Sequence, residues 1–96
     1  MKISNFSELQ EYIKGRDHNP DLKDKYFFKL IEEVGELADS LRKNRLMTSE
    51  QDFKGSIHEE IFDVIYYALA IANLHDIDVT ECINTKIDLN KTRSWE

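Results

Sequence analysis

Apolar residues recur along this chain at steps of three and four, which is the spacing of one side of an α-helix. The longest such run predicts a helix over residues 22–44. Its apolar seam consists of Phe27, Leu30, Val34, Leu37 and Leu41. A shorter run predicts a first helix over residues 5–14. We expect Gly15 to close this helix, because glycine readily adopts the left-handed conformation that ends many helices.

The third predicted helix begins at Ser56, where Ser56 and Glu59 have the spacing of a capping box. Between Ile61 and Ala72 the apolar residues fall on nearly every side of the helix. A helix of this kind is normally buried all round. The other helices of so short a chain are too few to cover it. The sequence therefore predicts a homo-oligomer that is at least a dimer.

A fourth helix is predicted from about Asp78, with Ile83 and Ile87 facing inward. The connector at residues 45–55 has room for a short helix that begins at Ser49. Three glycines and one proline leave few turns, which favours a few long helices over many strands. The predicted fold is all-α, a chain of four to five helices, and its 96 residues amount to one domain.

Charge and composition narrow the class of partner. The net charge of −6 argues against a protein that coats a nucleic-acid polymer, since such binding rests on neutralised phosphates. A single nucleotide remains possible as a ligand, because a bound metal ion reverses the local charge. The one cysteine cannot form an internal disulfide, so we expect a reducing cytoplasm.

No apolar segment typical of a signal peptide follows the N-terminus. The longest apolar run, Val64 to Ala72, has nine residues, whereas a membrane span needs about twenty. The sequence therefore predicts no membrane partner.

Two short acidic motifs lie within the second and third predicted helices. They are Glu32-Glu33-x-x-Glu36 and Glu60-x-x-Asp63. Residues three apart share a side of a helix, so each motif presents a pair of carboxylates. Two like charges about 4 Å apart repel by roughly 4 kcal/mol at an effective dielectric constant near 20. We therefore expect a hard divalent metal here, and the number of carboxylates fits two or more Mg²⁺ ions bridged by phosphate oxygens.

Lys86, Asn90 and Arg93 follow one another at steps of four and three, so they share one flank of the fourth predicted helix. Two cations and an amide in a row are typical of a surface that faces an anion. The alternative is an exposed stripe, whose cations are favourable near the C-terminus of a helix.

The run Lys29-Leu-Ile-Glu-Glu-Val-Gly-Glu-Leu-Ala38, followed by Glu60-Ile-Phe-Asp-Val64, resembles the MazG-like branch of the all-α nucleoside triphosphate pyrophosphohydrolases. The signature of that family is EExxE, a spacer and ExxD. The closing Lys86-x-x-x-Asn90-x-x-Arg93-x-Trp95 is similar to the last helix of the family. The resemblance spans roughly residues 22–96.

The resemblance implies a helical bundle that is completed by homodimerisation, often as a dimer of dimers. It also implies hydrolysis of a nucleoside triphosphate to a monophosphate and pyrophosphate, which depends on Mg²⁺, with Mn²⁺ as the alternative ion. Ribonucleotides and deoxynucleotides are both expected as substrates, and house-cleaning of nucleotide pools is the expected role. A non-catalytic helical module for oligomerisation or interaction remains the alternative function, because an apolar third helix could serve assembly alone.

The same resemblance assigns roles to particular residues. The metal ligands are Glu33, Glu36, Glu60 and Asp63, and the phosphate contacts are Lys86, Asn90 and Arg93. Glu32 and Glu36 are the catalytic candidates that would orient the attacking water. Apart from the resemblance, Tyr67 and Trp95 are aromatic candidates for stacking on the base; we favour core packing for Tyr67, and the two roles are equal alternatives for Trp95.

Overall fold

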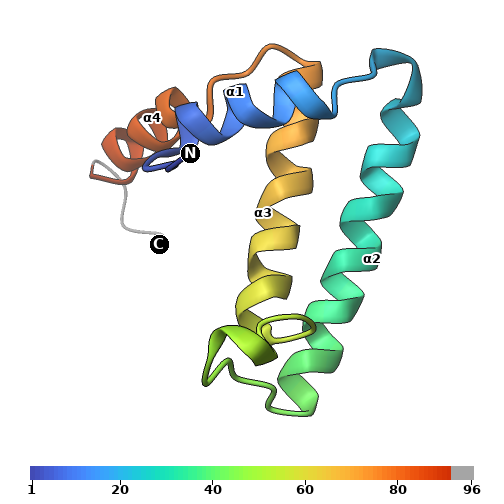
Figure 1. The fold of residues 1–96 in the computed structure, drawn as a ribbon. Coiled ribbons are helices and arrows are strands. Elements are labelled where there is room, and N and C mark those ends of the chain that lie inside the picture. The colour runs from blue at the N-terminus through green and yellow to red at the C-terminus, as the bar shows by residue number, and fades with distance from the viewer. Residues whose placement is uncertain (92–96) are drawn as a thin grey trace.

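The computed structural model describes residues 1–91, and these residues are helical without any β-strand (Figure 1). The all-α prediction is therefore confirmed. The elements follow one another as α1 (Phe6–Arg16), the 3-10 helix η1 (Pro20–Leu22), α2 (Lys23–Arg42), the 3-10 helix η2 (Glu50–Asp52), α3 (Ile57–Leu74) and α4 (Val79–Lys91).

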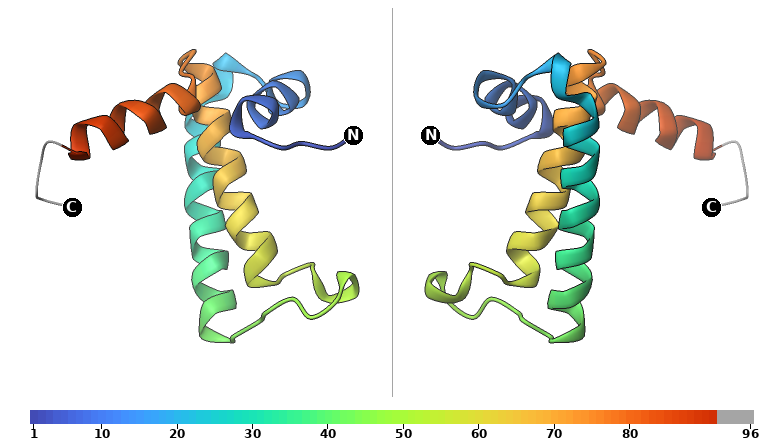
Figure 2. Two further views of the ribbon diagram at one scale, coloured as in Figure 1. Left: turned by 90° about the vertical axis from the view of Figure 1, so that its left-hand side faces the viewer. Right: turned by 90° about the vertical axis from the view of Figure 1, so that its right-hand side faces the viewer.

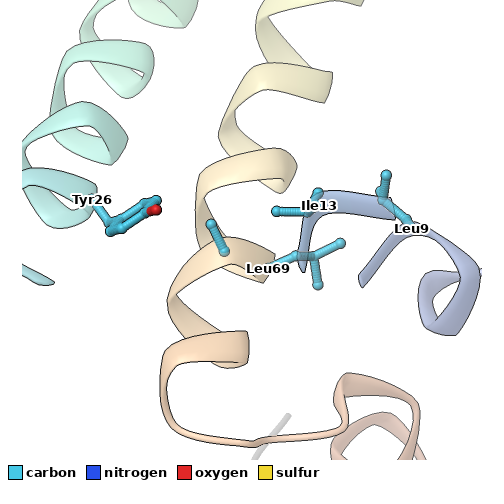
Figure 3. Close-up of a cluster of buried hydrophobic side chains, with 5 residues drawn as sticks. Leu9, Ile13, Tyr26 and Leu69 are labelled. Atoms are coloured by element: carbon cyan, nitrogen blue, oxygen red, sulfur yellow. The ribbon is translucent and has the colours of Figure 1, made fainter. Parts of the chain in front are cut away.

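The two longest helices, α2 and α3, run side by side in opposite directions and form the body of the molecule (Figures 1 and 2). Helix α1 packs across the C-terminal half of α3. The largest buried cluster lies where the three helices meet. It contains Leu9 and Ile13 from α1, Tyr26 from α2, and Leu69 and Ala70 from α3 (Figure 3). This cluster fixes the end of the α2–α3 pair at which α1 and α4 join it.

The start of α3 is confirmed, but only half of the predicted capping box is formed there. The hydroxyl oxygen of Ser56 accepts a hydrogen bond from the Glu59 amide at 3.1 Å, so α3 begins where predicted. The Glu59 carboxylate accepts from the amide of Gly55, at 2.7 Å, rather than from that of Ser56. The prediction for Gly15 is wrong, because α1 continues through this residue and ends at Arg16.

A buried polar contact ties α1 to the end of α3. The Gln10 side-chain amide donates to Asn73 Oδ1 at 2.9 Å, and the Asn73 side-chain amide donates to the backbone carbonyl oxygen of Gln10 at 2.9 Å. Gln10 also accepts from the Val79 amide, at 3.0 Å, where α4 begins. Because each group is satisfied only in this arrangement, the contact fixes the point at which α4 leaves the body.

Helix α4 packs against α1 and extends away from the α2–α3 pair (Figures 1 and 2). The prediction that Ile87 faces inward is wrong within one chain, since half of its surface is exposed. Helix α3 is not covered on all sides either. The two long helices expose large apolar side chains, namely Phe27, Phe28, Ile31, Val34, Leu41, Ile61 and Phe62. No helix in residues 1–91 is long and apolar enough to cross a membrane.

Candidate active site

Four predicted carboxylates meet between α2 and α3. Glu33 and Glu36 come from one helix, and Glu60 and Asp63 come from the other. Oxygen atoms of Glu33, Glu36 and Glu60 lie within 4.8 Å of one another, and so do those of Glu59, Glu60 and Asp63. All five side chains line one cavity of about 370 Å³, which we call the acidic pocket. The two motifs thus form one site instead of facing opposite sides of the molecule.

The carboxyl groups of this pocket are unequally buried. Glu60 is 5% exposed and Glu33 is 9% exposed, whereas Glu36 is open to solvent. One oxygen of Glu33, Oε1, is buried and has no hydrogen-bond partner among the described residues. A buried oxygen without a partner costs free energy, so the pocket is chemically incomplete as it stands.

Burial is the main cause of the raised pKa values in this pocket. It raises the pKa of Glu33 to about 7, with further contributions from a hydrogen bond to Glu36 and from the charges of Glu36 and Asp63. It raises the pKa of Glu60 to about 7, with the same neighbours adding to the effect. The pKa of Asp63 is also raised by burial, and by the charge of Glu59. Such shifts are expected where negative charges are crowded without a compensating cation.

Three further residues of the acidic pocket were not assigned to the site from sequence. Arg45 and Lys54 come from the connector between α2 and α3, and both line the pocket. The Lys54 charge acts to lower the pKa of Asp63, against the net upward shift. Glu59 was assigned only to helix capping, yet its carboxylate also belongs to the acidic group. No periodicity marks the connector, so only the three-dimensional structure shows which of its cations face the acids.

Glu32 lies outside the acidic pocket, although it is part of the first motif. Its side chain is 57% exposed and lies 3.7 Å from the Lys29 ammonium group. The same ammonium group lies 5.9 Å from the centre of the Tyr67 ring. Tyr67 is half-buried, packs against the buried core cluster and also lines a second cavity.

Within one chain, the two described residues of the row predicted on α4, Lys86 and Asn90, do not line the acidic pocket. Lys86 lines a separate hollow beside the start of α4, and Asn90 lies one turn farther from the body of the molecule. Arg93 and Trp95 lie outside the described residues. A phosphate-binding role for this row therefore requires α4 to reach a site on another subunit.

The acidic pocket has the donor set of a divalent-metal site. All its candidate ligands are carboxylate oxygens, which Mg²⁺ and Mn²⁺ prefer. The unpartnered oxygen of Glu33 and the raised pKa values of Glu33 and Glu60 indicate a place where positive charge is missing. The residues present therefore fit a divalent cation.

Comparisons with known proteins show the family. Residues 23–94 match the MazG nucleotide pyrophosphohydrolase domain. The chain belongs to the MazG nucleotide pyrophosphohydrolase family. A curated relative, the dATP/dGTP diphosphohydrolase of Cyanophage S-2L, is 37% identical over 92 residues, which cover 93% of this chain and 76% of that protein.

Solved MazG structures have the same fold. The Ntag form of iMazG from Vibrio DAT 722 is 42% identical and superposes with a TM-score of 0.89, over 97% of this chain and 100% of that one. A chain of the Ctag form is 46% identical, with a TM-score of 0.85 over 95% and 99% of the two chains. The helical arrangement described above is therefore that of a MazG protein, including α1, which precedes the matched domain.

Proposed function

We propose that this MazG nucleotide pyrophosphohydrolase converts deoxynucleoside triphosphates to monophosphates and pyrophosphate, with Mg²⁺ or Mn²⁺ bound in the acidic pocket. The observation that carries the proposal is the convergence of Glu33, Glu36, Glu60 and Asp63 on one cavity. The deoxynucleotide preference is supported by the curated relative, whose name gives dATP and dGTP as substrates. We further propose that residues 1–96 act as one domain in the cytoplasm, with house-cleaning of nucleotide pools as the role.

The metal would be held by the same four residues, Glu33, Glu36, Glu60 and Asp63. When bound, such an ion polarises phosphate oxygens and lowers the pKa of a coordinated water. Removing protons from Glu33 and Glu60 is part of binding, because both have pKa values near 7 and must offer charged oxygens to the ion.

Glu36 is the candidate in this pocket for orienting the attacking water. It is the exposed member of the group, so water reaches it, and it lies beside both buried carboxyl groups. Glu32 would not contact the cation or the water directly, since its carboxylate is exposed to solvent and pairs with Lys29. Glu36 would thus contact both the cation and the water, while the less exposed Glu33, Glu60 and Asp63 would serve the cation alone.

Two sets of side chains could bind the departing pyrophosphate. Lys54 and Arg45 already line the acidic pocket of their own chain. Lys86 and Asn90 do not line the pocket of their own chain, so we propose that the row of Lys86, Asn90 and Arg93 reaches it from a partner subunit. Because α4 extends away from the body, a dimer could place it over the neighbouring pocket (Figure 2). We propose that Lys54 is a phosphate contact in cis and that the α4 row acts in trans.

The exposed apolar side chains of α2 and α3 support a homodimer, with a dimer of dimers as the larger alternative. Phe28 is 63% exposed and Phe27 is 53% exposed on a helix that also contributes to the active site. Soluble monomers rarely expose so many large apolar groups together. Burying these groups between two copies would complete the bundle.

A nucleotide panel tests the proposed function. Purified protein is incubated with each dNTP and NTP in Mg²⁺, with a parallel reaction in EDTA, and phosphorus-31 NMR identifies the products. We expect monophosphate and pyrophosphate in Mg²⁺ and intact substrate in EDTA. Release of orthophosphate or tripolyphosphate would contradict the proposed bond cleavage. No product from any substrate would favour the alternative, an interaction module built on the exposed apolar surface.

A further inference from the structure

The connector between α2 and α3 leaves the end of one helix, loops outward and returns to the start of the other (Figure 2). Its middle, residues 46–53, does not line the acidic pocket. The pocket is lined at this end by Ser40, Arg45, Lys54, Gly55 and Glu59. The connector therefore meets the acids only at its two ends, and each end carries a cation.

Ser40 of α2 contacts both ends of the connector. It lies four residues after Glu36, on the helix face that carries the carboxylates, and it is 5% exposed. A serine within a helix can donate its hydroxyl to the carbonyl four residues earlier. The Ser40 hydroxyl instead donates to the carbonyl oxygen of Gly55 at 3.0 Å. The backbone carbonyl of Ser40 accepts from the Arg45 amide, also at 3.0 Å.

Gly55 is held from α3 as well. Its amide donates to the Glu59 carboxylate at 2.7 Å. That N–H belongs to the peptide group joining Lys54 to Gly55, whereas the carbonyl bonded by Ser40 belongs to the next peptide group. Because peptide groups are planar, the two hydrogen bonds fix two consecutive planes, one from each helix. Gly55 has a φ of 80°, which glycine adopts readily and other residues rarely do. The backbone of Lys54 is therefore fixed relative to the carboxylates of both helices.

We propose that Ser40 is a positioning residue, which acts through Gly55 to hold Lys54 at the acidic pocket for binding of the departing pyrophosphate. The inference rests on the proposed function in taking Lys54 as a phosphate contact. A lysine side chain is long and flexible, and this one is exposed, so its own packing does not position it. A fixed backbone limits where the ammonium group can go and reduces the ordering cost of binding an anion.

Binding of inorganic pyrophosphate in Mg²⁺, measured by isothermal titration calorimetry, tests the inference without turnover. Ser40→Ala should weaken binding by roughly two- to tenfold, because one neutral hydrogen bond that holds Lys54 in place is lost. Lys54→Met should weaken it by roughly tenfold or more, because a charge-assisted contact is lost. In a Lys54→Met background, Ser40→Ala should add less than about a twofold loss, since Ser40 acts only through Lys54.

Two further variants separate positioning from general loosening of the fold. Ser7→Ala is the matched control, because the Ser7 hydroxyl makes a 3.1 Å hydrogen bond to Thr80 and neither residue lines the acidic pocket. Its effect should be the same with and without Lys54→Met. Gly55→Ala disturbs the same two peptide planes without altering Ser40, and should reproduce both the loss and the dependence on Lys54. Circular dichroism checks that each variant retains its helices.

The same cycle read in kcat/KM for the preferred dNTP gives a second measurement. No loss in Lys54→Met, no loss in Ser40→Ala, or an equal loss in Ser40→Ala with and without Lys54 would overturn the inference. Any of these results in a protein that still releases pyrophosphate from dNTPs leaves the proposed function standing. Coupled pyrophosphate binding without hydrolysis of any dNTP would support the inference and contradict the proposed function.

Discussion

Glu60 is 5% exposed and shares the acidic pocket with the carboxyl groups of Glu33, Glu36 and Asp63. Its elevated pKa shows that the folded protein opposes its ionisation. We expect Glu60→Gln to abolish turnover and yet leave the metal-free protein at least as stable as the wild type, because one unfavourable charge is removed. Thermal denaturation in EDTA measures this.

The matched control for that variant is Glu11→Gln, which removes an exposed charge on α1. It should preserve turnover and change stability by no more than about 0.5 kcal/mol. If the metal-free Glu60→Gln protein lost several kcal/mol instead, Glu60 would be a structural partner and not a destabilised ligand.

The acidic pocket also predicts how stability depends on pH. The pKa values of Glu33 and Glu60 are near 7 in the folded protein and start from an ordinary value of 4.5. Between pH 4.5 and pH 7 these two groups hold more protons in the folded state than in the unfolded state. The stability of the folded state therefore falls as the pH rises through this range. We expect the metal-free protein to lose on the order of 3 kcal/mol or more from pH 4.5 to pH 7.5, since one group shifted from 4.5 to about 7 accounts for roughly that amount.

Urea denaturation at several pH values in EDTA measures this loss. Asp39 and Asp52 have lowered pKa values, so their opposite contribution is confined to pH values below about 4 and does not mask the trend. Glu60→Gln should flatten the dependence. A wild-type protein that becomes more stable across this range would contradict the assigned electrostatics.

At the scale of single residues, the sequence predicted the carboxylates of the site but not the neighbouring residues that surround them. The spacing of Glu33, Glu36, Glu60 and Asp63 was enough to place them on matching helix faces. The same spacing separates Glu33 from Glu32, because adjacent residues differ by about 100° around a helix and only Glu33 falls beside the apolar seam; Glu32 was kept as a candidate through the family resemblance alone. Lys54 lies in an aperiodic connector, so its approach to the acids depends on the path of that connector.

At the scale of elements, periodicity and capping located all four long helices, but not the direction of α4. That direction depends on the Gln10–Asn73 contact, which joins residues 63 positions apart and has no local signature. We expect Asn73→Ala to lower the free energy of unfolding by about 1–3 kcal/mol, because it leaves polar groups of Gln10 buried without partners.

The control for this substitution is Asn84→Ala, at an exposed position on α4 where little change is expected. The double variant Gln10→Ala with Asn73→Ala measures the coupling between the two side chains. Additive losses in that cycle would mean that the two residues act independently.

At the scale of the whole molecule, the exposed apolar side chains of α2 and α3 predict self-association. Light scattering should give at least twice the chain mass of 11.3 kDa at micromolar concentration. Phe28→Glu should shift the protein toward the monomer while preserving its helical circular dichroism, since Phe28 is 63% exposed within one chain. A wild-type monomer at that concentration would contradict the predicted dimer and, with it, the role of the α4 row in trans.

The central claim is that carboxylates from α2 and α3 form one pocket that binds divalent ions. A thermal titration with Mg²⁺ tests it most directly, because a ligand that binds only the folded state must raise the melting temperature. The account predicts a saturable rise for the wild type and for Glu11→Gln, and a greatly reduced rise for Glu60→Gln and Asp63→Asn. A melting temperature that saturating Mg²⁺ leaves unchanged in the wild type, or raises equally in all four proteins, would contradict it.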